Sequence, residues 1–197
     1  MKTTLLLLLF LLPFCLFSQT RQTAKSGYRP GGIISRNNDT ILVDIKLESI
    51  YLLQNEVKFI DESGKKKSFK PNIINGFYFD TEDEKMVFES RNDIRISALA
   101  PKYGYFINRV TNDVCPLYYF VNHKMVNVGI ESNMVNIPYY LILKNGNWEY
   151  ISSESFDDCV NVFKDDAALV NDIKAGKYSF NDIPEMVKRY CKSVKKK

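Results

Sequence analysis

The sequence predicts an α+β fold: an antiparallel β-sheet, arranged as a meander or roll of about eight to ten short strands, with two or three C-terminal helices. Two observations lead to this prediction. Between residues 32 and 152, short runs rich in Tyr, Phe, Val and Ile alternate with turn-forming residues. From Ser153 onward, the apolar residues recur instead with the period of an α-helix. Long helical patterns between the strands are missing, which disfavours a parallel sheet.

The first predicted hairpin illustrates how each strand pair is recognised. Residues 32–36 and 40–47 are β-forming runs. Asn37, Asn38 and Asp39 lie between them and tolerate the positive φ that a tight turn requires. The pattern of paired runs and turns continues along the chain. The remaining expected strands are residues 56–60, 66–70, 74–79, 85–90, 104–110, 116–121, 139–144 and 148–152.

Two helices are predicted after residue 153. The first contains Leu169 and Ile173 and ends at Gly176, because glycine commonly terminates a helix. Ser179, three residues before Asp182, favours the start of the second helix. Apolar residues of the second helix recur at i, i+3, i+4 and i+7, and we expect the stripe that they form to pack on the sheet. The stripe consists of Ile183, Met186, Val187, Tyr190, Cys191 and Val194.

The N-terminus has the layout of a secretory signal peptide. Lys2 precedes an apolar run, residues 5–17, and polar residues begin at Ser18, near which we expect cleavage. The run is shorter than the roughly 20 residues that a membrane-spanning helix needs. A lipoprotein anchored at Cys15 is less favoured, because Pro13 and Phe14 precede this cysteine and the apolar run continues beyond it. We therefore expect a secreted or periplasmic protein with no transmembrane segment in the mature chain.

Five segments make up the expected organisation. They are a signal peptide at residues 1–18, a flexible leader at 19–31, an antiparallel β domain at 32–152, a C-terminal helical segment packed on the sheet at 153–194, and a basic tail at 195–197. The net charge of +4 falls to +3 without residues 1–18, which contain one lysine and no acid. So small a charge gives no argument for a nucleic-acid partner.

Three cysteines remain after the expected cleavage: Cys115, Cys159 and Cys191. An oxidising compartment permits a disulfide, and an odd number leaves one thiol over. We expect the pair to be Cys159 and Cys191, because both fall in the helical segment. A C-x-x-C spacing is absent, so the sequence gives no support for redox catalysis of the thioredoxin kind.

No motif of catalysis or cofactor binding stands out. The sequence has no G-x-S-x-G, no G-x-G-x-x-G, no phosphate-binding G-x-x-x-x-G-K-[ST] and no EF-hand order. The only histidine, His123, is expected to be an exposed loop residue, and the cysteines lack the spacing of zinc ligands. We expect neither a metal nor a cofactor.

Aromatic residues offer the clearest candidate for a binding surface. They concentrate in the later strands, where alternation should bury about half of them and expose the rest for stacking on a sugar or a peptide. Packing in the core is the alternative use of the same side chains. The candidate binding residues are Tyr103, Tyr105, Tyr118 and Tyr139.

The order of several segments resembles a group of uncharacterised secreted proteins of Bacteroidetes bacteria. The resemblance rests on "GGIISRNNDTILVDIKL", "NEVKFIDESGKKKSFKPNIINGFYF", "GYFINRV", "LYYFV", "YYLILKNGNWEYI" and "FNDIPEMVKRYC". In that family the domain typically opens with a strand, the tripeptide "GDT" and a second strand. In some members the domain precedes an outer-membrane β-barrel. This sequence has Asn38 where the glycine is usual, and an apparent insertion at residues 122–138. The family has no established activity, so the resemblance implies a fold and a location only.

These observations together predict a non-enzymatic envelope module that binds a protein or a glycan. One alternative is a small envelope hydrolase that uses paired carboxylates. A further alternative is a structural accessory of an outer-membrane complex, which would expose a sizeable apolar patch. Carboxylates that converge in a deep pocket would favour the hydrolase, and exposed tyrosines on an open sheet face would favour the binding module.

Overall fold

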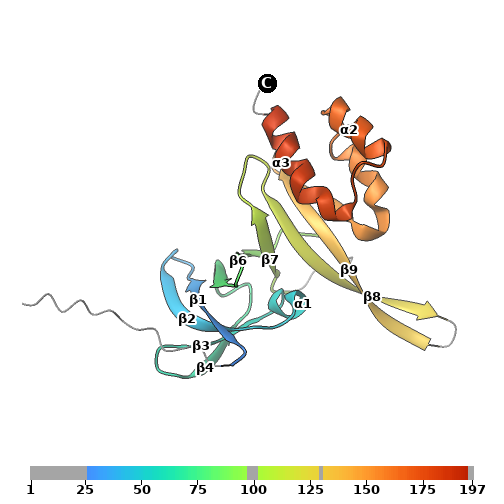
Figure 1. Cartoon of the computed structure of the whole chain (residues 1–197). Coiled ribbons are helices and arrows are strands. Elements are labelled where there is room, and N and C mark those ends of the chain that lie inside the picture. The colour runs from blue at the N-terminus through green and yellow to red at the C-terminus, as the bar shows by residue number, and fades with distance from the viewer. Residues whose placement is uncertain (1–25, 97–101, 129–130, 195–197) are drawn as a thin grey trace, which may run out of the picture.

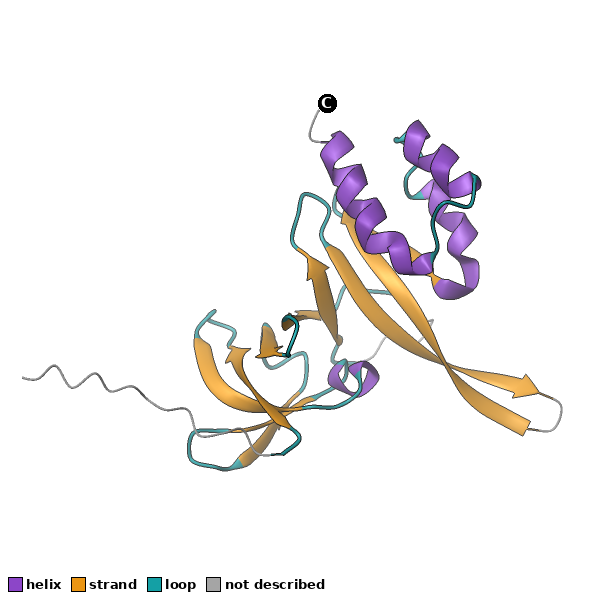
Figure 2. Cartoon of the chain, viewed as in Figure 1, coloured by secondary structure: helices purple, strands orange, loops and turns teal. Residues whose placement is uncertain are grey.

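The computed structural model describes residues 26–96, 102–128 and 131–194 of the chain. Ten antiparallel strands form one sheet, and short helices follow at the C-terminal end (Figures 1 and 2). The predicted α+β fold is confirmed. The expected signal peptide at residues 1–18 and the basic tail at 195–197 lie outside the described residues, as does most of the expected leader.

The strands succeed one another in the chain with one short helix, α1 (Ile50–Leu53), between the second and the third. The strands are β1 (Tyr28–Ile34), β2 (Thr40–Lys46), β3 (Val57–Ile60), β4 (Lys66–Phe69), β5 (Gly76–Asp80), β6 (Lys85–Arg91), β7 (Tyr105–Thr111), β8 (Leu117–Val128), β9 (Glu131–Lys144) and β10 (Asn147–Ser152). The helical segment comprises η1 (Ser153–Asn161), α2 (Ala167–Lys174), η2 (Phe180–Asp182) and α3 (Ile183–Val194).

The strand order is β10-β9-β8-β7-β6-β5-β1-β2-β3-β4. Every neighbouring pair is consecutive in the chain except β5 and β1, so the sheet is a meander in which β1 lies between β2 and β5. Gly31 of β1 is opposite both Val43 and Phe79. A Cβ atom at this position would overlap the carbonyl oxygen of Tyr78, so the strand approaches β5 closely because it carries glycine.

The largest differences from the expected strand boundaries lie in β1, β8 and β9. β1 begins at Tyr28, inside the segment assigned to the leader, because residues 28–30 pair with the end of β2. β8 and β9 continue through residues 122–138, where the sequence indicated an insertion between two shorter strands. This stretch is rich in Asn and lacks a buried apolar alternation, so its strand character was not apparent from the pattern.

Aromatic side chains fill the core of the N-terminal half. Phe77 stacks on Phe88 with ring centroids 4.6 Å apart and meets the edge of Phe106 at 5.0 Å. All three rings are fully buried. The other buried members of this cluster are Ile33, Val43, Ile45, Leu53, Val57, Phe59, Ile74 and Phe79.

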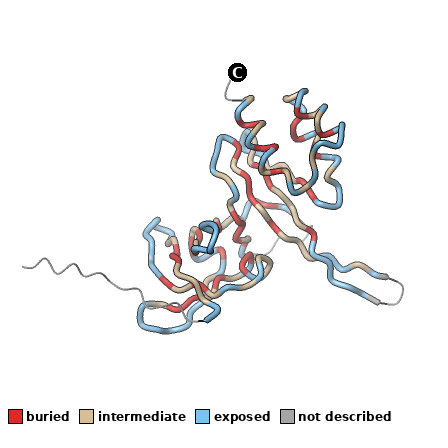
Figure 3. The backbone as a smooth tube through the Cα atoms, in the orientation of Figure 1, coloured by how far each residue is buried: buried red, intermediate tan, exposed pale blue. Residues whose placement is uncertain are grey.

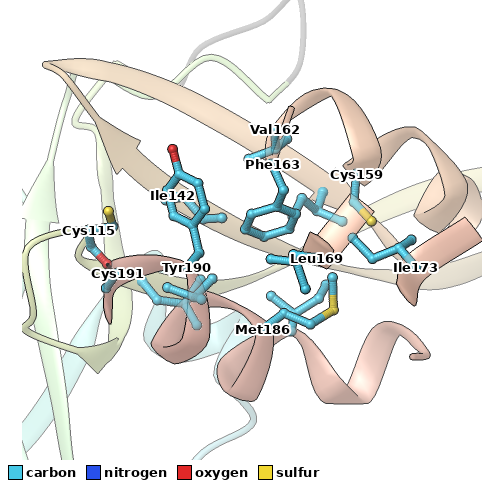
Figure 4. Packing of buried hydrophobic residues seen from close by; sticks show 14 residues of the cluster. Cys115, Ile142, Cys159, Val162, Phe163, Leu169, Ile173, Met186, Tyr190 and Cys191 are labelled. Atoms are coloured by element: carbon cyan, nitrogen blue, oxygen red, sulfur yellow. Dashed lines mark hydrogen bonds between the residues drawn. The ribbon is translucent and has the colours of Figure 1, made fainter. Parts of the chain in front are cut away.

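The helical segment covers the sheet at β8, β9 and β10, where a second core cluster lies (Figures 1 and 4). The expected stripe of α3 supplies much of this cluster: Ile183, Met186, Val187, Tyr190 and Cys191 are all buried. The predicted helix ends are also present. Gly176 follows α2 with φ +71°, and the N–H and the hydroxyl of Ser179 both donate to Asp182.

One polar contact between the sheet and the helical segment is sensitive to pH. The Lys144 ammonium of β9 lies 2.7 Å from the Asp165 carboxylate, which also accepts a hydrogen bond from Tyr190 at 2.8 Å. The hydrogen bonds from Lys144 and Tyr190 hold the pKa of Asp165 below its ordinary value. The ionised carboxylate therefore stabilises the folded state at pH values above about 4, the ordinary range of an aspartate.

Asp165→Asn should therefore reduce stability in a pH-dependent way. At neutral pH the variant should unfold at a lower urea concentration than the wild type. As the pH falls through the folded-state pKa of Asp165, the wild type loses this contribution and the two midpoints should converge. Urea titrations at several pH values between 2 and 7 measure the difference. The exposed neighbour Asp157, changed to Asn, is the control, and a gap that stays constant with pH would contradict the assignment.

Candidate functional site

Three of the four candidate tyrosines come together, but they point into a core cluster. Tyr105, Tyr118 and Tyr139 belong to the cluster of Ile94, Ile107, Phe120 and Leu141. Tyr118 is buried, and its hydroxyl donates to Glu89 at 2.9 Å. Burial, with the nearby Glu89 carboxylate, raises the pKa of Tyr118 to about 12. Tyr118 therefore packs in the interior, whereas Tyr105 and Tyr139 are half-buried and pack against the same cluster.

Tyr103, the fourth candidate, lies apart from the other three. Its ring is 38% exposed and has two lysine ammonium groups near it, Lys70 at 4.7 Å and Lys102 at 5.5 Å from the ring centroid. Cation–π contacts of this kind stabilise an exposed ring in place. The expected row of exposed tyrosines on one sheet face is therefore not formed by these four residues.

A polar network borders the tyrosine cluster. Arg109 contacts Glu89 at 2.6 Å, and the Arg91 guanidinium lies 4.8 Å from the centroid of the Trp148 ring. Burial alone would raise the pKa of Asp93, but hydrogen bonds from Arg91 and Trp148 hold it below its ordinary value. The Arg91 guanidinium covers the Trp148 ring, and the indole N–H donates to Asp93. Both the ring and the N–H of this tryptophan therefore have partners within the protein.

None of the described carboxylates with a resolved pKa shift has the raised pKa of a general acid. An acid catalyst requires a carboxyl with a raised pKa. Within the described part of the chain, every aspartate or glutamate with a resolved shift has a lowered pKa instead: Glu48, Asp61, Asp93, Asp165, Asp166, Asp172 and Asp182. The same ranges contain no cluster of three His, Cys, Asp or Glu side chains that could hold a metal ion.

An open hollow of about 680 Å³ between α2 and α3 contains two of the acids, Asp166 and Glu185. Asp166 accepts the backbone N–H of Leu169 at 3.0 Å and so caps α2. Lys188, Arg189 and Lys192 line the same hollow. Its acids are thus surrounded by cations, and one of them has a structural role at a helix end.

The three described cysteines are free thiols and are all buried. Cys191 lies beside Cys115, whereas Cys159 lies at the opposite end of the same cluster (Figure 4). The expected pairing of Cys159 with Cys191 therefore does not match the geometry. The pairing was predicted because both residues fall in the helical segment. The neighbours of a helical side chain depend, however, on which side of the helix it lies. The side of α3 that carries Cys191 packs against the start of β8.

The most distinctive exposed feature is the outer part of the β8–β9 hairpin. We use the term arm for residues 124–128 of β8 and 131–136 of β9. β7 pairs with β8 only at residues 117–119, and β10 pairs with β9 only at residues 139–144. Within the described part of the chain, the arm consequently has two strands, with no third strand on either side. It projects beyond the rest of the molecule (Figure 1).

The base of the arm is fixed by α1 and the residue that follows it. The side chain of Gln54 accepts the Val121 N–H at 2.7 Å and donates to the Val121 carbonyl at 2.9 Å. Tyr51 stacks on His123 with ring centroids 3.4 Å apart. His123, expected in an exposed loop, is thus a half-buried strand residue that is held against α1. Beyond it, no helix covers the arm (Figure 1).

The arm exposes apolar side chains. Met125 and Met134 are directly opposite each other in the register and are 64% and 57% exposed. Val135 is 42% exposed and lies opposite Lys124, whose ammonium contacts Glu154 at 3.3 Å. Residues 124–127 and 132–136 of the arm are exposed or intermediate (Figure 3). In the sequence, the only indication of this surface is that two methionines occur within a polar stretch.

Comparison with protein-family models, with curated proteins and with solved structures finds no significant match to this chain. Among the described helices, none has the length and apolar content needed to cross a bilayer.

Proposed function

We propose that this protein is a secreted or periplasmic envelope module that binds a protein partner through the arm. The observation that carries the proposal is the exposed Met125 and Met134 pair on a two-stranded ribbon whose outer edges have no strand partner. An isolated two-stranded hairpin is only marginally stable in water, so a partner that covers the arm would also stabilise it.

The chemistry of the arm favours a protein over a glycan. Its unpaired strand edges offer rows of backbone N–H and C=O groups, which an extended segment of another protein can pair with by strand addition. Methionine side chains are flexible and polarizable and adapt to apolar partner surfaces. Sugar recognition would use exposed aromatic rings, but Tyr118 is buried and Tyr105 and Tyr139 are half-buried against the same core cluster. The expected signal peptide at residues 1–18 supports an extracytoplasmic location for this interaction.

Removing the apolar side chains of the arm should weaken partner binding. We expect Met125→Ser with Met134→Ser to raise the Kd of a purified partner by about tenfold or more, because truncating buried anchor residues costs at least about 1.4 kcal/mol. Both side chains are exposed in the free protein, so the thermal midpoint should change little. Titration by calorimetry measures the Kd of each variant.

The partner is first identified by photo-crosslinking, with a benzophenone side chain at position 134 or, as the control, at position 42. A specific protein captured from position 134 alone is then purified for the titration. The matched control variant is Leu42→Ser with Val114→Ser, since both residues are more than half exposed and lie outside the arm. Equal binding by the arm variant and the control variant would refute the proposal. If position 134 crosslinks only to other copies of this chain, the proposal that the arm binds a different protein is refuted.

A further inference from the structure

Two of the three buried cysteines meet where the helical segment joins the sheet. Cys115 lies between β7 and β8, and Cys191 lies in α3. The Cys191 Sγ lies 4.0 Å from the carbonyl oxygen of Cys115, to which its thiol donates, and the Cys191 thiol contributes to the raised pKa of Cys115. Both residues occupy the same end of one core cluster (Figure 4).

We propose that Cys115 and Cys191 form a disulfide that ties α3 to the turn before β8 when the chain meets a small or protein disulfide oxidant. The thiolate of one cysteine attacks a sulfur of the external disulfide and releases one oxidant thiolate. The second cysteine then attacks the resulting mixed disulfide, forms the intramolecular S–S bond and releases the other oxidant thiolate. The two cysteine protons leave with the two released thiols, so the cysteines lose two electrons to the oxidant.

Neither thiol is open to solvent while the helical segment is docked, since Cys115 is 5% exposed and Cys191 is fully buried. Cys191 lines a surface hollow of about 540 Å³ together with Pro184, Val187 and Lys188. Burial, together with the neighbouring Cys191 thiol, raises the pKa of Cys115 to about 12, so its thiolate is scarce at neutral pH. The folded protein should therefore oxidise slowly, and the bond should form faster while the helical segment is still docking.

Cys159 provides an internal control. It is buried at the other end of the cluster, and burial raises its pKa to about 11. No described cysteine lies beside it, so we expect it to remain a thiol. The three described cysteines then form one bridge and one buried free thiol.

Peptide mapping by mass spectrometry tests the proposal on the full chain. The protein is refolded with oxidised and reduced glutathione, free thiols are alkylated, and the digest is analysed without reduction. We expect a linked peptide pair that contains residues 115 and 191, with residue 159 alkylated. A pair of residues 159 and 191 would overturn the proposal, as would complete alkylation of 115 and 191 after prolonged oxidation.

Variants then test the effect of the bond on stability. The bond spans 76 residues, and closing a loop of this size constrains the unfolded chain. Oxidised wild type should melt about 5 to 10 °C above the reduced protein. Cys159→Ala should retain this shift, and Cys115→Ala should lose it. The assignment would be contradicted if the difference in melting temperature were lost in Cys159→Ala and kept in Cys115→Ala. If a variant fails to fold, peptide mapping of the wild type still tests the proposal.

Discussion

Phe77→Ala should lower the free energy of unfolding by about 3 to 5 kcal/mol, the range for truncating a fully buried phenylalanine. Phe77 is stacked on Phe88 and in edge contact with Phe106, so the change removes two aromatic contacts and leaves a cavity in a closely packed cluster. Urea denaturation followed by circular dichroism measures the loss.

The control for this change is Phe69→Ala. Phe69 lies in the edge strand β4, is only partly buried and packs on Phe59 with ring centroids 5.1 Å apart. Its truncation should cost about 1 to 2 kcal/mol, since solvent already reaches the ring. Equal losses for both variants would mean that the stability of the sheet is not concentrated at the stacked rings.

Gln54→Ala should also be strongly destabilising, by about 2 to 4 kcal/mol. The Gln54 side chain is fully buried, and it satisfies both the N–H and the carbonyl of Val121 at the point where β7 no longer pairs with β8. Removing the amide leaves two backbone groups without their partner, each at a cost of about 1 to 3 kcal/mol. Chemical denaturation measures the total, and hydrogen exchange at the Val121 amide should accelerate.

Gln54→Glu separates the two hydrogen bonds. The carboxylate still accepts the Val121 N–H but cannot donate to the Val121 carbonyl, so protection of the amide should largely persist while stability falls. Asn55→Ala is the matched control, because Asn55 is exposed and bonds only to the neighbouring Tyr51 carbonyl. Unchanged exchange at Val121 in Gln54→Ala would show that the side chain does not fix the base of the arm.

Local features of the structure were predictable from the sequence because neighbouring residues determine them. Asn38 has φ +67° in the first hairpin turn, as a tight turn between two strands requires. The glycine after α2 and the Ser179 and Asp182 contacts at the next helix start are set by residues within one turn. The apolar stripe of α3 likewise follows from a spacing that any helix converts into one face.

Features that depend on distant residues were not predictable. The position of β1 between β2 and β5 requires a chain return of about forty residues, and no local pattern marks it. Which cysteine faces Cys191 depends on how α3 crosses the sheet. The sequence left a surface and a core position open for the tyrosines, because the side of a strand that is covered depends on the whole fold. Tyr118 is buried, and Tyr105 and Tyr139 are half-buried against the same cluster.

The lysine run in the β3–β4 hairpin protects the end of the sheet. β4 is the last strand in the sheet order, and a bare edge of this kind invites pairing with another chain. Lys66 and Lys67 are both exposed on it, and Lys67 contacts Asp61 at 2.7 Å. Exposed lysines on an edge strand disfavour its pairing with another molecule. Concentrated samples should therefore resist edge-to-edge aggregation at β4, and removal of these two charges would open this edge to unwanted strand addition.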